Sequence, residues 1–269
     1  MRCVTRHTDY QSRTDVFRLI PITDWHLGNM HSNEKYMREL VKEIEGDPFT
    51  YWIGLGDYAE YITHRDPRFD AGELADWLLT REAMVDMGKA ETRRFLNMVE
   101  PIKDKCRALA EGNHEQALSA HGDSDVYSNI VEALKGKSAH KLDHRGFVTW
   151  RFSRQGANSW PLRIFATHGS GGGSSKGNAG NKMGKLAEQV DGLDLLLMGH
   201  LHDPDYKPMA KMRVGPRDSR NVTIHCVSCP ALCGDMQYAN NKDLPALPTG
   251  HVEIFVTPNS HQIDVKMSV

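Results

Sequence analysis

The chain has 269 residues, of which 39% are hydrophobic and 25% charged, values ordinary for a globular protein with an α/β core. Its formal net charge of -2 offers no overall electrostatic attraction for nucleic acids or anionic membranes. No run approaches the roughly 18 apolar residues that a membrane span requires. The N-terminus lacks a signal-peptide core and the five cysteines are an odd number, so we expect a cytoplasmic protein.

The first expected strand covers residues 16–22 and leads directly to Asp24 and His26. Its apolar, β-branched composition is typical of a buried strand. Residues two apart on an extended chain share a face, so this carboxylate and this imidazole can reach one ion together.

A helix and a second strand follow. Apolar residues recur at helical spacing over residues 37–44, with Asn33 as a suitable N-cap. The strand over residues 50–55 then runs into Gly56 and Asp57. Strand, helix and strand in this order predict a sheet that begins parallel.

Residues 61–105 are predicted to be helical or irregular, with methionines and aromatics that suit a core. Most arginines here fit a solvated face. Arg65 and Arg68 lie soon after Asp57, and Arg65 is taken as a candidate substrate-binding residue. A third strand over residues 106–110 leads to Asn113 and His114, and a helix follows over residues 127–134.

The second half of the chain indicates further strands. Paired strands over residues 147–153 and 162–167 lead to His168, and a glycine-rich loop and a helix over residues 182–190 follow. The strand over residues 195–198 leads to His200 and His202. Strands near residues 222–227, 251–256 and 262–265 predict a hairpin-rich second sheet. With no repeat and no long linker, we expect one domain over residues 1–269.

The polar side chains that follow these strands are metal-ligand types. They are Asp24, His26, Asp57, Asn113, His114, His168, His200 and His202. Open α/β sheets place their sites at the carboxyl ends of strands, where these side chains would gather. Carboxylate, imidazole and amide ligands suit Mn, Fe, Zn or Ni, of which Mn is our first choice. Their number suits two divalent ions if one carboxylate joins them.

Three cysteines form a second possible metal motif, Cys226-x-x-Cys229-x-x-x-Cys233. A zinc or iron–sulfur site would need a fourth ligand, and none is evident. Three cysteines around a strand and turn are more often small buried residues, and we interpret them so.

The ligand series resembles the calcineurin-like metallophosphoesterases, whose motifs are D-x-H, G-D, G-N-H-[D/E], an isolated H and G-H-x-H. All five occur here in order, as Asp24-Trp25-His26, Gly56-Asp57, Gly112-Asn113-His114-Glu115, His168 and Gly199-His200-Leu201-His202. The resemblance implies a two-sheet αββα sandwich. It also implies a dinuclear metal-dependent phosphoesterase.

The resemblance also implies a role for each residue. Asp24, His26 and His202 would hold one metal, while Asn113, His168 and His200 would hold the second. Asp57 would bridge the two ions. His114 would contact the substrate phosphate and assist the leaving group, and Glu60 would orient His114.

The resemblance implies that the substrate is a phosphate ester, and several kinds of ester stay open. The opening motif is closest to the DNA-repair exonuclease branch, which favours a phosphodiester in a nucleic acid or a nucleotide. The Gly-Asp-Tyr and Gly-Asn-His-Glu motifs are more similar to the protein phosphatase branch, so a phosphomonoesterase is the alternative. A non-catalytic scaffold is disfavoured by the complete ligand set.

The glycine-rich loop after His168 would lie at the rim of the site. Glycine and serine dominate residues 169–177, and such a chain loses much entropy when it is ordered. We therefore expect a mobile loop from which Lys176 binds an anionic substrate, together with Lys182 and Lys185. Solvated lysines on a plain loop are an equally good interpretation.

Overall fold

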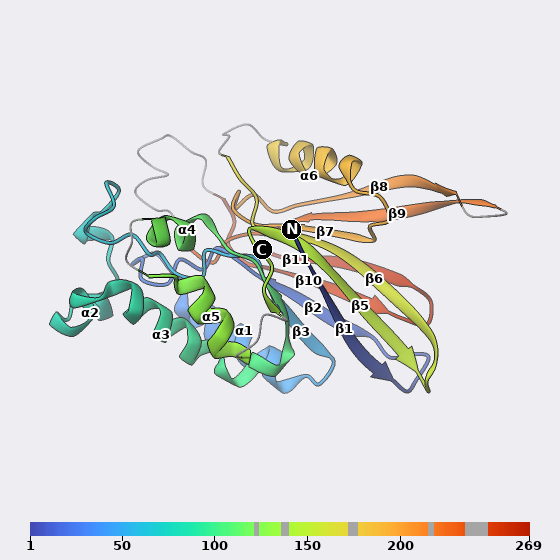
Figure 1. Ribbon diagram of the computed structural model, residues 1–269, viewed down its shortest axis with the longest axis horizontal. Coiled ribbons are helices and arrows are strands. Elements are labelled where there is room, and N and C mark those ends of the chain that lie inside the picture. Colours follow the sequence, from blue (N-terminus) through green and yellow to red (C-terminus); the bar gives the residue numbers. More distant parts are fainter. Residues whose placement is uncertain (121–123, 136–139, 172–176, 215–217, 235–246) are drawn as a thin grey trace.

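The computed structural model describes residues 1–120, 124–135, 140–171, 177–214, 218–234 and 247–269. Two β-sheets stack face to face at its centre (Figure 1). The first sheet has the order β1-β5-β6-β7-β9-β8 and the second β11-β10-β2-β3-β4. The strands are β1 (Arg2–Tyr10), β2 (Phe17–Ile22), β3 (Thr50–Gly54), β4 (Cys106–Leu109), β5 (Arg145–Arg154), β6 (Ala157–Thr167), β7 (Leu195–Met198), β8 (Asp205–Val214), β9 (Ser219–Ser228), β10 (His251–Thr257) and β11 (Gln262–Ser268).

Helices cover the outer face of each sheet. The helices are α1 (Glu34–Gly46), α2 (Arg81–Val85), α3 (Met87–Val99), α4 (Asn113–Ala120), α5 (Val126–Lys135) and α6 (Asn178–Gln189). Helices α1, α3 and α5 pack on the five-stranded sheet, and α6 packs on the six-stranded sheet (Figure 1). This order of layers confirms the expected α/β sandwich.

Of the strands that lead to the polar motifs, β2, β3, β6 and β7 lie inside the two sheets, and β4 is the edge strand next to β3. Strands β2, β3 and β4 pair in parallel, and β6 and β7 pair in parallel in the other sheet. Apolar side chains of both sheets fill the space between them, including Leu19, Ile53, Ile164 and Leu197. Because neighbouring parallel strands end at one edge of a sheet, the loops that follow them come together.

One prediction about the sheets was wrong. The strands after residue 222 do not form a separate second sheet. Strand β9 pairs with β7 in the first sheet, and the hairpin of β10 and β11 pairs with β2 in the second. Strands β1 and β8 were not expected either. They are sheet edges with mostly exposed residues, so their sequences carry little of the apolar pattern that marks a strand.

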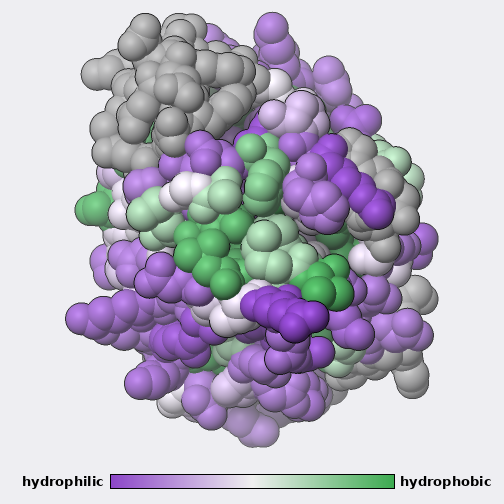
Figure 2. Space-filling model, turned by 90° about the vertical axis from the view of Figure 1, so that its left-hand side faces the viewer, coloured by the Kyte–Doolittle hydropathy of each residue, from purple (hydrophilic) through white to green (hydrophobic). Residues whose placement is uncertain are grey.

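The helices, the cysteines and one exposed hydrophobic patch bear on further expectations from the sequence. In the part of the chain that the structure describes, no helix is long and apolar enough to cross a membrane. Cys226, Cys229 and Cys233 are buried thiols, as predicted. Figure 2 views the side on which α2 lies and shows hydrophobic side chains gathered near its centre. Val85, on α2, is 80% exposed.

Candidate active site

The predicted metal ligands come together at the ends of five strands. Three groups have ligand atoms within 4.8 Å of one another, and the residues of these groups are Asp24, His26 and His202; Asp57, His168 and His200; and His26, Asp57 and His114. Asn113 joins the second group, since its Oδ1 lies 2.9 Å from Nε2 of His168. Five of these residues are buried, namely Asp24, His26, Asp57, His114 and His168. Asn113, His200 and His202 are partly exposed.

In the first group, Asp24 is the central residue. Its Oδ1 lies 3.2 Å from Nε2 of His202, and the same nitrogen lies 3.4 Å from Nε2 of His26. Its Oδ2 accepts hydrogen bonds from the Thr23 hydroxyl and the His200 amide, at 2.5 and 2.9 Å. Burial raises the pKa of Asp24, but His202 and His168 together bring it below its usual value. Asp24 is therefore an ionised carboxylate held in one orientation.

In the second group, four acceptor atoms surround the His168 ring, namely the Leu55 carbonyl, Oδ2 of Asp57, Nδ1 of His200 and Oδ1 of Asn113. Nδ1 of His168 donates to the Leu55 carbonyl at 2.8 Å, because a carbonyl oxygen can only accept. In a neutral ring, Nε2 of His168 then carries a lone pair. This nitrogen lies 3.2 Å from Oδ2 of Asp57 and 3.2 Å from Nδ1 of His200. Electron-rich atoms that converge in this way require a positive charge among them.

The protonation of His168 expresses this requirement. Burial lowers the pKa of His168, yet the charge and hydrogen bond of Asp57, together with the charges of Asp24 and Glu115, raise it to about 9. Burial and His168 together lower the pKa of His200 to about 4, so His200 is neutral and offers a lone pair. A divalent cation satisfies the same lone pairs at the same place, and the donors are those that transition metals prefer. These residues therefore fit a metal centre.

The backbone at this centre is strained. Asp24, His26, Asp57, His200 and His202 all have φ between 46° and 68°. The left-handed region costs a non-glycine residue about 1–3 kcal/mol, and such strain gathers at functional sites. Hydrogen bonds between loops hold it: the amides of Trp25 and His26 both donate to the Asp57 carbonyl, at 3.0 and 3.2 Å.

Glu60 acts differently from the sequence-based expectation. Its carboxylate Oε2 lies 2.9 Å from Nδ1 of His26, so it orients a ligand of the first group rather than His114. His114 is held by the backbone carbonyl of Glu60, which accepts from its Nδ1. Both contacts fix the imidazole that each serves, as outer partners of metal-site histidines commonly do.

Glu115 is a functional residue to which the sequence analysis assigned no role. It is fully buried and accepts from the amides of Gly112, Asp57 and Tyr58, at 2.8, 3.0 and 2.8 Å. It thereby ties the loop after β3 to the loop after β4. Burial, with Asp57 as a second cause, raises its pKa to about 7. The signal was present, since Glu115 is the last residue of the Gly-Asn-His-Glu motif.

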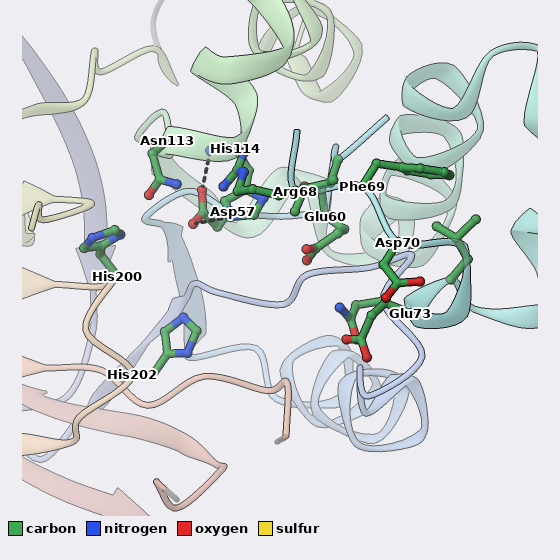
Figure 3. A pocket seen from close by; sticks show the side chains of 13 residues that line it. Asp57, Glu60, Arg68, Phe69, Asp70, Glu73, Asn113, His114, His200 and His202 are labelled. Carbon is green, nitrogen blue, oxygen red and sulfur yellow. Dashed lines mark hydrogen bonds and ion pairs between the residues drawn. The ribbon is translucent and has the colours of Figure 1, made fainter. Parts of the chain in front are cut away.

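A cavity of about 400 Å³ adjoins the metal-ligand groups. Figure 3 shows His200 and His202 on one side of it and Phe69, Asp70 and Glu73 on the opposite side. Arg68 lines this cavity, whereas Arg65 lines a separate one of about 200 Å³ beside α2. The structure therefore does not bring Arg65 to the metal ligands.

The lysines of the glycine-rich loop are only partly described. Lys176 lies outside the described residues. Lys182 donates to the carbonyls of Ser170 and Gly171, at 2.8 Å each, so it ties α6 to the start of the loop. Lys185 is exposed on α6.

Comparison with known proteins finds several phosphoesterases among solved structures. Among solved structures, a metallophosphoesterase from Sphaerobacter thermophilus is 15% identical, with 94% of this chain and 89% of the other covered and a TM-score of 0.41. The calcineurin-like phosphoesterase YfkN from Bacillus subtilis is 11% identical, with 94% and 90% covered and a TM-score of 0.39. A predicted phosphoesterase from Streptococcus pneumoniae is 12% identical, with 94% and 99% covered and a TM-score of 0.36.

No curated protein sequence matches the chain. At such low structural similarity, the assignment rests on a family match in the sequence. Residues 17–204 match the family described as calcineurin-like phosphoesterase, and this range contains every metal ligand discussed above. Since the match spans most of the chain, the protein belongs to the calcineurin-like phosphoesterase family and is a hydrolase.

Proposed function

We propose that the protein hydrolyses a small phosphodiester with the help of two divalent metal ions. Asp24, His26 and His202 would hold one ion. Asn113, His168 and His200 would hold the other, with the Asp57 carboxylate between them. The convergence of lone pairs on two neighbouring points supports this assignment. Manganese is the proposed metal, because the ligands are oxygen and imidazole nitrogen without thiolate.

Such an ion pair, when bound, supplies charge for the phosphoryl oxygens and lowers the pKa of a water molecule. The protein's own contribution is to hold and orient. Glu60 and the Leu55 carbonyl fix the rings of His26 and His168 so that Nε2 of each faces the site. The Glu115 carboxylate fixes the backbone that carries Asp57.

His114 is proposed to protonate the leaving oxygen. Its Nδ1 donates to the Glu60 carbonyl, and its backbone amide donates to Oδ1 of Asp57 at 2.9 Å (Figure 3). The ring lines the cavity, and Nε2 lies 3.9 Å from Oδ2 of Asp57. With Nδ1 committed to the carbonyl, Nε2 is the atom that would carry the transferable proton.

The charge of the cavity is the observation that favours a diester. Among the described residues that line it, Arg68 is the only lysine or arginine, against the carboxylates of Asp57, Glu60, Asp70 and Glu73. Arg68 is itself paired with Asp66, with nitrogen–oxygen distances of 3.0 and 2.7 Å. Such a surface repels a dianionic monoester more than a monoanionic diester. The residues of this surface that the structure describes also form no basic groove of the kind that binds a nucleic acid chain.

Two alternatives have some support. A nuclease is favoured by the likeness of the opening motif to the DNA-repair exonuclease branch. A phosphomonoesterase is favoured by Arg68, whose guanidinium could bind an additional phosphate oxygen. We also propose a cytoplasmic location, which the thiol state of the five cysteines supports.

One comparison of substrates tests the proposal. The manganese-loaded protein is assayed with bis-p-nitrophenyl phosphate, p-nitrophenyl phosphate and single-stranded DNA. We expect kcat/KM to be highest for the small diester. Faster cleavage of p-nitrophenyl phosphate would establish a phosphomonoesterase, and faster cleavage of DNA would establish a nuclease.

A further inference from the structure

The cavity beside the metal ligands extends well beyond the reacting centre. Its far end is formed by the segment between Ile62 and Leu74, away from His200 and His202 (Figure 3). A volume of about 400 Å³ lies in the range that encloses a small organic ligand. A phosphate group occupies only the metal end, so the remaining space is available to one arm of the ester.

The far end has an aromatic side chain held by packing. Phe69 packs against a buried cluster formed by Leu74, Leu78, Ala83 and Met87. Ile62 and Leu74 add apolar surface to the same cavity. The ring of Phe69 is half-buried, so part of it remains accessible to a ligand. A rigid, accessible aromatic ring provides a stacking surface for a planar ligand.

Hydrogen-bonding groups surround this apolar surface. Asn29 is 4% exposed. Its Oδ1 accepts a hydrogen bond from the His31 amide at 2.9 Å, and this contact fixes the orientation of the Asn29 side-chain amide. The Asp70 carboxylate accepts from the Gly72 amide at 2.8 Å through Oδ1. Glu73 lies 3.7 Å from the His31 ring. Asn29, Asp70 and Glu73 all line the cavity, and the Asp70 carboxylate can accept a hydrogen bond from a ligand that donates one.

We propose that this end of the cavity binds a nucleobase that carries an amino group, so that the substrate is a nucleoside phosphodiester. An aromatic ring stacks on the base while carboxylate and amide groups read its edge, a combination typical of base recognition. A cationic alkylamine would instead call for several aromatic rings around it. In the described part of the cavity wall, Phe69 is the only phenylalanine, tyrosine or tryptophan.

This inference rests on the proposed diester hydrolysis. The position of His114 indicates which arm of the ester is the leaving group. His114 lines the same cavity as Phe69, so the arm in the cavity is the one that leaves. The attacking water loses one proton to the solvent as its oxygen bonds to phosphorus. The bond from phosphorus to the nucleoside oxygen breaks, and His114 gives its proton to that oxygen and regains one from the solvent. The products are a free nucleoside and a phosphomonoester of the other alcohol.

Binding of free nucleosides tests the proposal without any need for hydrolysis. Adenosine, guanosine and inosine are titrated calorimetrically into the manganese-loaded full chain. Inosine differs from guanosine only by the absence of the 2-amino group. We expect adenosine and guanosine to bind about 5- to 150-fold more tightly than inosine, the range for one well-formed base contact. Equal affinities for the three nucleosides would overturn the assignment.

Variants locate the binding. Phe69→Ala should weaken the binding of all three nucleosides about 5- to 150-fold. Phe69→Tyr keeps the aromatic ring and should leave their affinities unchanged. Asp70→Asn and Glu73→Gln together should remove the preference for amino-bearing bases. Glu82→Gln, on α2 and outside this cavity, is the matched control and should change nothing. Full binding by Phe69→Ala would contradict the stacking role.

The two proposals fail in different ways. Hydrolysis of bis-p-nitrophenyl phosphate without nucleoside binding would refute the base site and leave diester hydrolysis standing. Nucleoside binding without cleavage of any diester would do the reverse. Adenosine 5′-methyl phosphate then tests the direction: release of adenosine and methyl phosphate is expected, whereas release of methanol and adenosine monophosphate would overturn the role of the cavity.

Discussion

Gly112 packs so closely against Asp57 and Glu115 that no side chain fits at its position. It lies between β4 and α4, where its amide donates to Glu115 at 2.8 Å. A Cβ added at Gly112 would stand 2.1 Å from Oδ1 of Asp57, 2.3 Å from the Asp57 amide nitrogen and 2.5 Å from Oε2 of Glu115. An ordinary contact begins at 3.4 Å, so the two Asp57 atoms would have to move by more than 1 Å.

Gly112→Ala should therefore displace Asp57, the carboxylate between the two ligand groups. A displacement of about 1 Å at a reacting centre costs about 10²-fold in rate. Overpacking at a buried position costs about 1–3 kcal/mol of stability. The variant should still fold, but kcat on bis-p-nitrophenyl phosphate should fall about 10²-fold or more, and elemental analysis should find fewer than two metals per chain.

Gly46→Ala is the matched control for this substitution. Gly46 ends α1, and a Cβ added there meets nothing within 4 Å. Alanine in a helix is about 0.5–1 kcal/mol more favourable than glycine, so urea unfolding should show equal or greater stability and unchanged kcat. A Gly112→Ala protein with wild-type kcat and two metals would refute the view that close approach of Gly112 positions Asp57.

Further predictions follow from the same geometry. Asp57→Asn should keep the fold but abolish hydrolysis, because an amide joins two cations poorly; two metals and full activity would contradict a bridging role. His114→Ala should retain both metals and lose about 10²–10⁴ in kcat for alkyl esters but less for nitrophenyl esters, whose leaving groups need less proton assistance. An equal loss for both kinds of ester would assign His114 to phosphate binding instead. Remote from the site, burial raises the pKa of Glu253, but hydrogen bonds from Lys266 and Arg18, at 2.7 and 2.8 Å, bring it from 4.5 down to about 2. Because this folded-state pKa is depressed, the stabilisation is complete above about pH 4.5 and is lost as the pH falls towards 2. Glu253→Gln should accordingly be less stable than the wild type at pH 7, with a difference that disappears near pH 2 in urea unfolding; a pH-independent difference would mean that packing, not charge, is lost.

Buried parallel strands and the residues that follow them could be predicted from the sequence. Strand β7 was predicted with the bounds that the structure has, and β2, β3 and β4 to within one residue at either end. Strands buried on both faces appear as continuous apolar runs, which are visible without any knowledge of their partners. Polar residues directly after such runs therefore marked the edge at which the metal ligands gather.

The pairing of distant segments was decided only by the tertiary structure. The edge strands β1 and β8 bury few side chains, so their strand conformation depends on their partners β5 and β9 rather than on their own pattern. The same holds for the wall of the cavity. Arg65 and Arg68 are three residues apart in an irregular segment. Phe69 packs on its apolar cluster, and the adjacent Arg68 lines the cavity of the site, whereas Arg65 lines a separate cavity.

The contacts of the individual ligands follow the same division. The residue types and their order along the chain were sufficient to predict a calcineurin-like phosphoesterase, and the family match confirms that prediction. Which imidazole the Glu60 carboxylate holds could not be deduced, because Glu60 reaches both His26, through its side chain, and His114, through its carbonyl. Side-chain reach and backbone φ decide between them, and both are set by loops that bond to one another across the ends of the strands.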